Sequence, residues 1–94
     1  MELDFGKGPM FHTWLDLPES WNVSNEDEDK FIRFEIDDME GYYAGETLPD
    51  GKRFDCWVAY EDDIGGDIVL ANFHADSFEE AKRMLEACAD ALYE

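Results

Sequence analysis

The spacing of the apolar residues changes once along this chain, at Ser77, and that change limits the possible folds more than any other feature. Before Ser77, apolar residues recur at every second position, as they do in a strand that buries one face. After Ser77 they recur at steps of three and four, as they do along one side of a helix. The sequence therefore predicts an α+β fold in which a sheet comes first and one covering helix comes last.

Three segments before Ser77 carry the strand pattern. Every second residue is apolar in residues 30–37 and again in residues 54–61, and residues 67–75 form a longer apolar run. Residues 11–17 alternate well enough to form an extra N-terminal strand. Within residues 1–25, which are otherwise hard to place, two tryptophans are candidates to cover the sheet face that the helix leaves open: Trp14 and Trp21.

Turn signals suggest how these strands connect. Pro49-Asp50-Gly51 would pair a weaker strand at residues 41–48 with residues 54–61, and Gly65-Gly66 marks the next hairpin. We therefore expect a four-stranded antiparallel meander, possibly with the extra N-terminal strand, covered by one C-terminal helix. The four expected strands are residues 30–37, 41–48, 54–61 and 67–75.

The C-terminal helix has a clear start. Residues 77–80 read Ser-Phe-Glu-Glu, which is the spacing of a capping box. An apolar stripe follows, made of Phe78, Ala81, Leu85, Cys88 and Leu92. We expect this stripe to pack on the apolar side chains of the sheet, namely Ile32, Phe34, Ile36 and Val58.

Length and composition limit the class of protein. The 94 residues suffice for a single domain, residues 1–94, and 15% aromatic residues argue against a disordered acidic chain. The first residues lack the basic and apolar regions of a signal peptide, and no apolar run is long enough to span a membrane. We expect a cytoplasmic protein, without membrane contact, that is a monomer or a weak homodimer. Cys56 and Cys88 fall at apolar positions and are expected to be buried thiols.

Acidic residues dominate the charge of the chain. There are 25 Asp and Glu against 7 Lys and Arg, so the formal net charge is -18. In an antiparallel meander the turns after the first and third strands lie at the same end of the sheet, and the returning helix ends near them. The expected strands therefore predict one acidic, partner-binding end, made of Asp37, Asp38, Glu40, Glu61, Asp62, Asp63, Asp67, Asp90 and Glu94.

Known site chemistries do not fit this acidity. A calcium loop of the EF-hand type beginning at Asn25 would have Lys30 in place of the turn glycine and Ile36 in place of the bidentate glutamate. His12 and His74 have no partner at metal-ligand spacing, and His74 is expected to be structural. No nucleophile-base pair or phosphate-binding loop is present, so we expect no enzyme activity, no cofactor and no metal. Two simple explanations of the acid remain open, solvated turns and the acidic surface of a halophile's protein.

The amount of charge suggests a partner. A compact chain of this length is about 32 Å across, and duplex DNA carries about 19 phosphate charges over that distance. An acidic domain could thus compete for the Lys and Arg of a nucleic-acid-binding groove. It should not bind nucleic acid directly.

Two segments resemble a known family. Residues 13–18, Thr-Trp-Leu-Asp-Leu-Pro, and residues 34–40, Phe-Glu-Ile-Asp-Asp-Met-Glu, are similar to segments near the start of ArdA-type antirestriction proteins, which are acidic DNA mimics that inhibit type I restriction enzymes. The resemblance implies that Asp37, Asp38 and Glu40 act as phosphate-like acids. The strand-to-helix ending is also similar to that of HicB-like antitoxins.

These observations lead to two functional hypotheses. The first is a non-catalytic, nucleic-acid-mimicking inhibitor of a basic DNA- or RNA-binding protein, such as a restriction or phage-defence component. The alternative is an adaptor or antitoxin-like subunit that docks through a sheet edge or an aromatic face, for which Trp57 is a candidate anchor.

Overall fold

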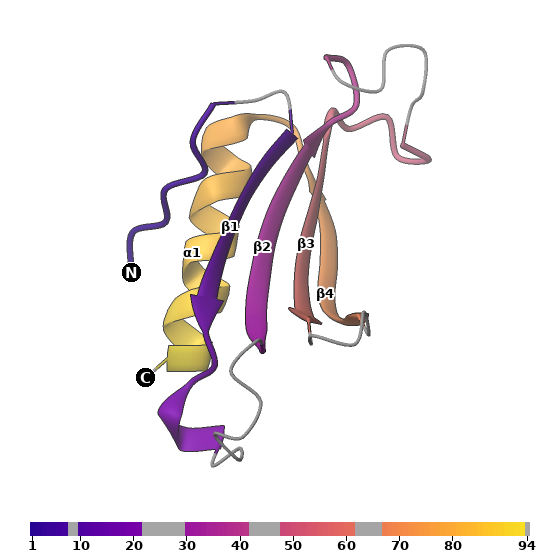
Figure 1. Cartoon of the computed structure of the whole chain (residues 1–94). Helices are drawn as coiled ribbons and strands as arrows, with labels where there is room; N and C mark the ends of the chain where they lie inside the picture. Colours follow the sequence, from indigo (N-terminus) through magenta and orange to yellow (C-terminus); the bar gives the residue numbers. More distant parts are fainter. Residues whose placement is uncertain (8–9, 22–29, 42–47, 62–66, 94) are drawn as a thin grey trace.

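A computed structural model describes residues 1–7, 10–21, 30–41, 48–61 and 67–93 of the chain. Four strands precede one long helix, with a short 3-10 helix, η1 (Glu19–Trp21), after the first strand (Figure 1). The strands are β1 (Met10–Asp16), β2 (Phe31–Asp38), β3 (Phe54–Glu61) and β4 (Asp67–Ala75), and the helix is α1 (Phe78–Tyr93). The expected α+β fold, a four-stranded antiparallel sheet with one C-terminal helix, is confirmed.

The strands follow one another across the sheet in the order β1-β2-β3-β4, and every neighbouring pair is antiparallel. The N-terminal strand suggested by residues 11–17 is therefore one of the four. The expected pairing of residues 41–48 with 54–61 is wrong, because β2 and β4 occupy the two sides of β3. The turn at residues 48–51 does form, with Gly51 N donating to Leu48 O, but residues 42–47 lie outside the described residues.

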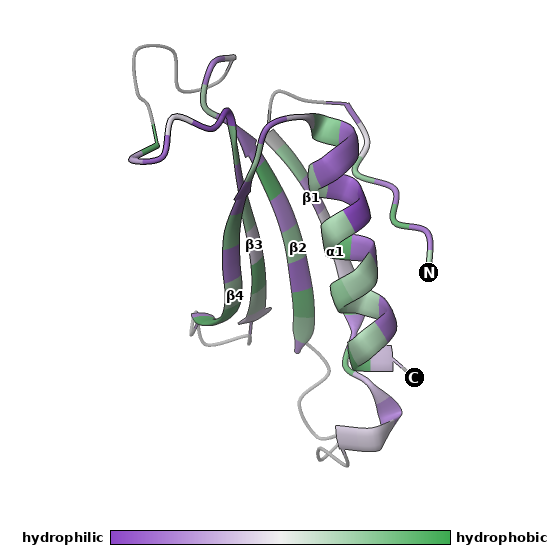
Figure 2. Ribbon diagram, turned by 180° about the vertical axis from the view of Figure 1, so that it is seen from behind, coloured by the Kyte–Doolittle hydropathy of each residue, from purple (hydrophilic) through white to green (hydrophobic). Residues whose placement is uncertain are grey.

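The helix begins and packs as its sequence predicts. Glu80 N donates to Ser77 Oγ at 3.1 Å, which caps the first turn of α1. Figure 2 shows the strands alternating between hydrophobic and hydrophilic residues, and α1 packs against β2, β3 and β4. Leu85 lies at the centre of the helical stripe and is fully buried. The expected sheet partners Ile32, Phe34, Ile36 and Val58 are all in the same core.

The N-terminal segment adds to this core. Leu3 and Phe5 are buried, and the Phe5 ring packs edge-on against Phe78 at the start of α1. Leu3 N donates to Glu86 on the helix at 2.8 Å. Trp21 also packs against the core, so of the two tryptophans only Trp14 lies on the sheet face opposite the helix.

The cysteines are where the apolar pattern placed them. Cys56 is fully buried in β3 and Cys88 is half-buried in α1, and both are free thiols. Burial raises the pKa of the Cys56 thiol to about 12. This cysteine is therefore protonated at neutral pH, which suits a core residue and not a nucleophile.

The central position of Leu85 gives a direct test of the packing. Leu85→Ala should lower the free energy of unfolding by about 2–5 kcal/mol, because it leaves a cavity under the sheet. Leu70→Ala makes the same chemical change at a side chain that is 44% exposed and should cost less than about 1 kcal/mol. Urea denaturation of both variants measures the difference, and equal losses would contradict the packing described here.

Candidate functional site

The sheet face opposite α1 is the candidate functional site, and we call it the open face. No described element covers it (Figure 1). Because side chains alternate along each strand, the polar residues between the core positions all project from this face. It holds His12 and Trp14 of β1, Arg33, Glu35 and Asp37 of β2, Asp55, Trp57 and Glu61 of β3, and Asp67 of β4.

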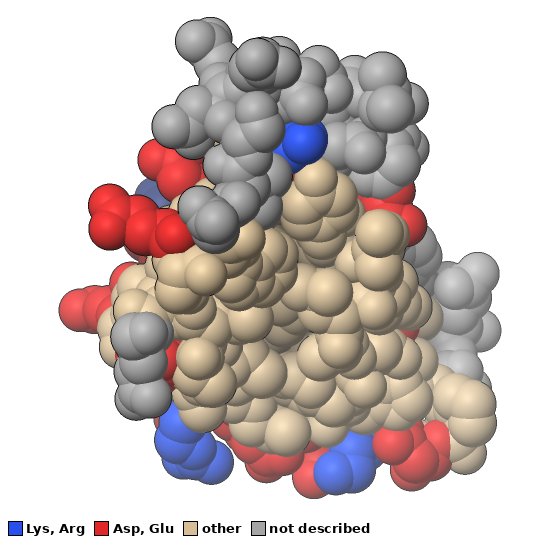
Figure 3. All heavy atoms as spheres, turned by 90° about the horizontal axis from the view of Figure 1, so that it is seen from below, with Lys and Arg blue, Asp and Glu red and all other residues tan. Residues whose placement is uncertain are grey.

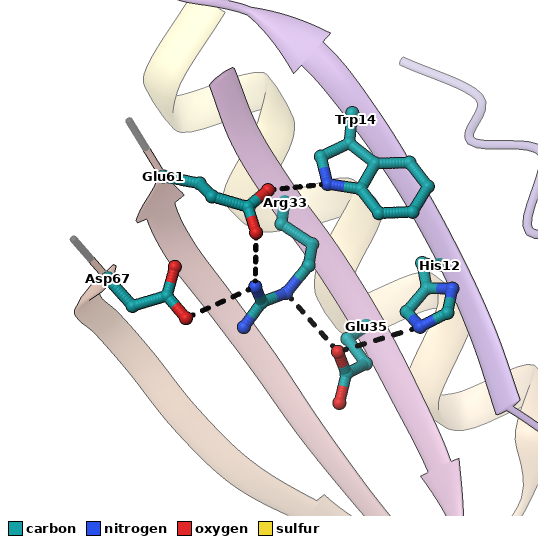
Figure 4. Close-up of polar contacts among 6 residues, drawn as sticks. All are labelled: His12, Trp14, Arg33, Glu35, Glu61 and Asp67. Atoms are coloured by element: carbon teal, nitrogen blue, oxygen red, sulfur yellow. Dashed lines mark hydrogen bonds and ion pairs between the residues drawn. The ribbon is translucent and has the colours of Figure 1, made fainter. Parts of the chain in front are cut away.

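Arg33 is the centre of this face. Its guanidinium lies 2.9 Å from Glu61, 3.2 Å from Glu35 and 3.4 Å from Asp67, so one cation meets three carboxylates on three strands (Figure 4). The Arg33 side chain is only 18% exposed. The positive charge is thus neutralised inside the molecule, and the cluster as a whole remains acidic.

An aromatic pair borders the Arg33 cluster on β1. Trp14 Nε1 donates to Glu61 Oε2 at 2.7 Å, and the His12 ring lies 5.1 Å from the Trp14 ring, centroid to centroid, at a tilt of 32°. Trp14 remains 49% exposed. The pair therefore presents an aromatic surface beside carboxylates, a combination that suits contact with a cationic partner.

Asp37 is an unusual member of the open face. It is only 7% exposed, and its Oδ1 atom has no hydrogen-bond partner. Burial raises the pKa of Asp37 to about 7, and the nearby carboxylates Glu35 and Asp55 raise it as well, against a hydrogen bond from Trp57 that lowers it. A proton near neutral pH therefore relieves the repulsion between Asp37 and Glu35.

Asp38 has a structural task at the end of β2. Its Oδ1 accepts hydrogen bonds from Glu40 N and Gly41 N, both at 3.1 Å, and Arg53 binds both carboxylate oxygens at 3.0 Å. The hydrogen bonds from Arg53 hold the pKa of Asp38 below its usual value. A Cβ on Gly41 would lie 2.8 Å from Asp38 Oδ2, so any larger residue there would displace the carboxylate that Arg53 binds.

The expected convergence of nine acids on one end is wrong for the acids that are described. Asp38 is paired with Phe54, whereas Glu61 is paired with Phe31 at the other end of the β2–β3 ladder. Eight strand residues separate these ends by about 24 Å. Asp37, Asp38 and Glu40 therefore lie far from Glu61 and Asp67. Asp90 lies in the last turn of α1. Three of the nine lie outside the described residues: Asp62, Asp63 and Glu94.

Exposure also divides the predicted acids. Asp37 and Asp38 are buried, so neither presents a free carboxylate to a partner. Glu40, Asp67 and Asp90 are exposed, with 74%, 48% and 52% of their side-chain surface accessible. Figure 3 views the end at which β1 and β3 finish, and uncharged side chains make up most of it, with acidic side chains around its margin.

Sequence reasoning missed Arg33, Glu35 and Trp14 as parts of one site. A signal was present, because Arg33 and Glu35 occupy alternate positions between the apolar residues of β2, which places them on one face. The contact with β1 was not visible, since it depends on pairing Trp14 with Arg33 across the sheet.

The remaining candidates have structural partners. His74 Nδ1 lies 2.7 Å from Asp50 Oδ2 in the turn before β3, which agrees with its expected structural role. Among the described residues, no group of three or more His, Cys, Asp or Glu is arranged to hold a metal ion. In the same part of the chain, no helix combines the length and hydropathy needed to cross a bilayer.

Asp37 links stability to pH. The native state keeps its proton up to about pH 7, whereas the unfolded chain releases it near pH 3.8, so the native state binds more protons in between. Stability should therefore fall as the pH rises from 4 to 7. Asp37→Asn, whose amide can donate to Glu35 as the protonated acid does, should lose less stability over this range and exceed the parent at pH 8 by at least about 1 kcal/mol. Thermal and urea unfolding from pH 4 to 8 measure this, and parallel curves for the two proteins would refute it.

No known protein family, curated protein or solved structure matches this chain. The resemblance to ArdA-type proteins therefore stays a prediction. In the structure its first segment, residues 13–18, spans the end of β1, and its second, residues 34–40, spans most of β2 and the Asp38 turn. Of the three phosphate-like acids that the resemblance implies, only Glu40 is exposed.

Proposed function

We propose that this chain is a non-catalytic acidic binding domain that occupies the nucleic-acid-binding groove of a basic protein. The observation that supports this most is the internal pairing of two of the three arginines, Arg33 and Arg53. Arg33 contacts three carboxylates and Arg53 contacts two, Asp38 and Glu40, while the chain as a whole carries a net charge of -18. The surface offered to a partner is therefore acidic, and basic proteins are the partners it attracts.

The dimensions of the molecule are compatible with this proposal. The longest extent is 43 Å, over which duplex DNA carries about 25 phosphate charges. The two shorter extents are 27 and 24 Å. Acids at both ends of the sheet, instead of at one, suit a long basic groove better than a single point contact.

A second candidate is an adaptor that docks through apolar contacts. The exposed large apolar residues favour it, because Trp14 on β1 and the run from Ile68 to Leu70 on β4 all have more than 40% of their surface accessible. Affinity carried by such anchors would depend little on salt. Affinity carried by the acids would fall steeply with salt, which separates the two candidates.

Two triple variants test the acidic surface at equal net charge. One replaces three exposed acids near the start of α1 and the Asp38 turn: Glu40→Gln, Asp76→Asn and Glu79→Gln. The other replaces three exposed acids at the opposite end: Asp16→Asn, Asp67→Asn and Asp90→Asn. Each should weaken binding to a basic partner captured from the native host and lower the salt concentration at which that partner elutes, because fewer carboxylates face it.

Each triple serves as the control for the other, because both remove the same number of acids. A larger loss in one triple identifies the end that contacts the partner, and equal losses indicate a groove that spans both ends. Duplex DNA added in excess should displace the captured partner. If neither triple changes the elution and DNA does not compete, the acids serve solvation and the adaptor candidate takes precedence.

Direct binding to nucleic acid is expected to be absent. The repulsion between phosphates and a chain of net charge -18 should keep gel-shift titrations with duplex DNA and with RNA free of any complex at about 0.15 M salt. A shifted band in the absence of any other protein would contradict the proposed mimicry.

A further inference from the structure

β4 is an outer strand of the sheet. The order β1-β2-β3-β4 gives it β3 on one side and no neighbouring strand among the described residues on the other (Figure 1). The outer side of such a strand presents backbone N–H and C=O groups that an extended chain can pair with. Adding a strand to a sheet edge is a common mode of peptide recognition.

The side chains of β4 are unusually apolar for an exposed edge. Ile68, Val69 and Leu70 are 61%, 52% and 44% exposed. The strand contains no Lys, Arg or Pro, the residues with which proteins commonly block an edge against pairing.

A bulge interrupts the pairing of β4 within this run. Val69 pairs with Ala59 and Ala71 pairs with Val58, so Leu70 has no partner on β3. The extra residue breaks the strict alternation of faces at this point. Ile68 and Val69 keep the regular register, opposite Tyr60 and Ala59, so they project from opposite faces of the sheet at its outer strand, where a fifth strand would lie beside them.

The charges around β4 select its occupant. At the Asp67 end, Arg33 is matched by three carboxylates. At the other end, Asp50, Asp55 and Asp76 surround Lys52 and His74. A second copy of the chain would bring another net charge of -18 to this edge, so self-pairing is opposed by repulsion, whereas a cationic strand is attracted.

We propose that the β4 edge binds an extended segment of the basic partner, in which apolar residues alternate with Lys or Arg. The backbone of this segment would pair with β4, its apolar side chains would contact those exposed side chains of the Ile68–Leu70 run that share their face, and its cations would face the carboxylates at the strand's ends. The inference rests on the proposed function, and it names the place at which the partner docks.

Two capped synthetic peptides, each as long as β4 (9 residues), test the docking mode. One alternates valine and lysine, and the other alternates glycine and lysine, so that charge and length are equal while only the first readily forms a strand. The valine peptide should bind at least about tenfold more tightly and should slow amide hydrogen exchange in β4. Equal affinities, or protection elsewhere than in β4, would overturn the proposal.

A charge-neutral variant tests the same edge in the protein. Ile68→Thr, Val69→Thr and Leu70→Thr together keep β-branched or strand-compatible residues but remove apolar contact area. This triple should bring the affinity of the valine peptide down to that of the glycine peptide. Trp14→Thr, which removes exposed apolar surface from the open face on the opposite edge strand, should lower this affinity less than the triple does. If Trp14→Thr has the larger effect, the open face and not the β4 edge is the docking site.

These outcomes separate the docking mode from the proposed function. If the peptide experiments fail but a basic protein is still captured in a salt-dependent way, the proposed function stands and only the β4 site is refuted. Analytical ultracentrifugation tests the remaining alternative. If the chain forms a dimer that the threonine triple dissociates, a second copy occupies the edge and the inference is overturned.

Discussion

The ladder between β2 and β3 joins Phe31 to Glu61 at one end and Asp38 to Phe54 at the other. This pairing determines which side chains lie on each face of the sheet and which lie at each of its ends. It directs Ile32, Phe34 and Ile36 toward α1 and directs Arg33, Glu35 and Asp37 away from it. A slip of one residue would bury the charges and expose the core, so the same interaction that builds the core also composes the open face.

The open face compensates its own charge only in part. Arg33 joins three carboxylates from three strands, so ion pairs around a largely buried guanidinium tie the sheet together, although the carboxylate of Asp67 is exposed. Asp37 is buried and lies beside Glu35, and its pKa is raised by burial first and by Glu35 second. Near neutral pH the face therefore balances ionised acids against one retained proton. Ionising Asp37 would add the negative charge that a basic partner attracts, but it would lower the stability of the fold.

Most of the fold could be predicted from local patterns, and the errors came from pairing. The period of two, the helix cap at Ser77 and the apolar stripe of α1 are local, and each was found where expected. Which segment completes the four strands cannot be read from a local pattern. It depends on the pairing of residues 10–16, which form β1, with β2. Placing a strand at residues 41–48 reversed which turns share an end, and one such error moved Asp37 and Asp38 to the wrong end of the sheet.

The burial of those two acids was equally hidden from the sequence. An aspartate at the end of a strand is usually solvated, and only the three-dimensional approach of Arg53 makes Asp38 a turn anchor. What composition predicted correctly was the excess of charge, since no arrangement of the chain can neutralise 25 acids with 7 bases. Two of the seven bases, Arg33 and Arg53, are already paired with acids of the fold, and this pairing leaves the net charge of -18 unchanged. A basic partner, bound as proposed, would supply positive charge to this acidic chain, and the exposed apolar run of β4 is the place proposed for it.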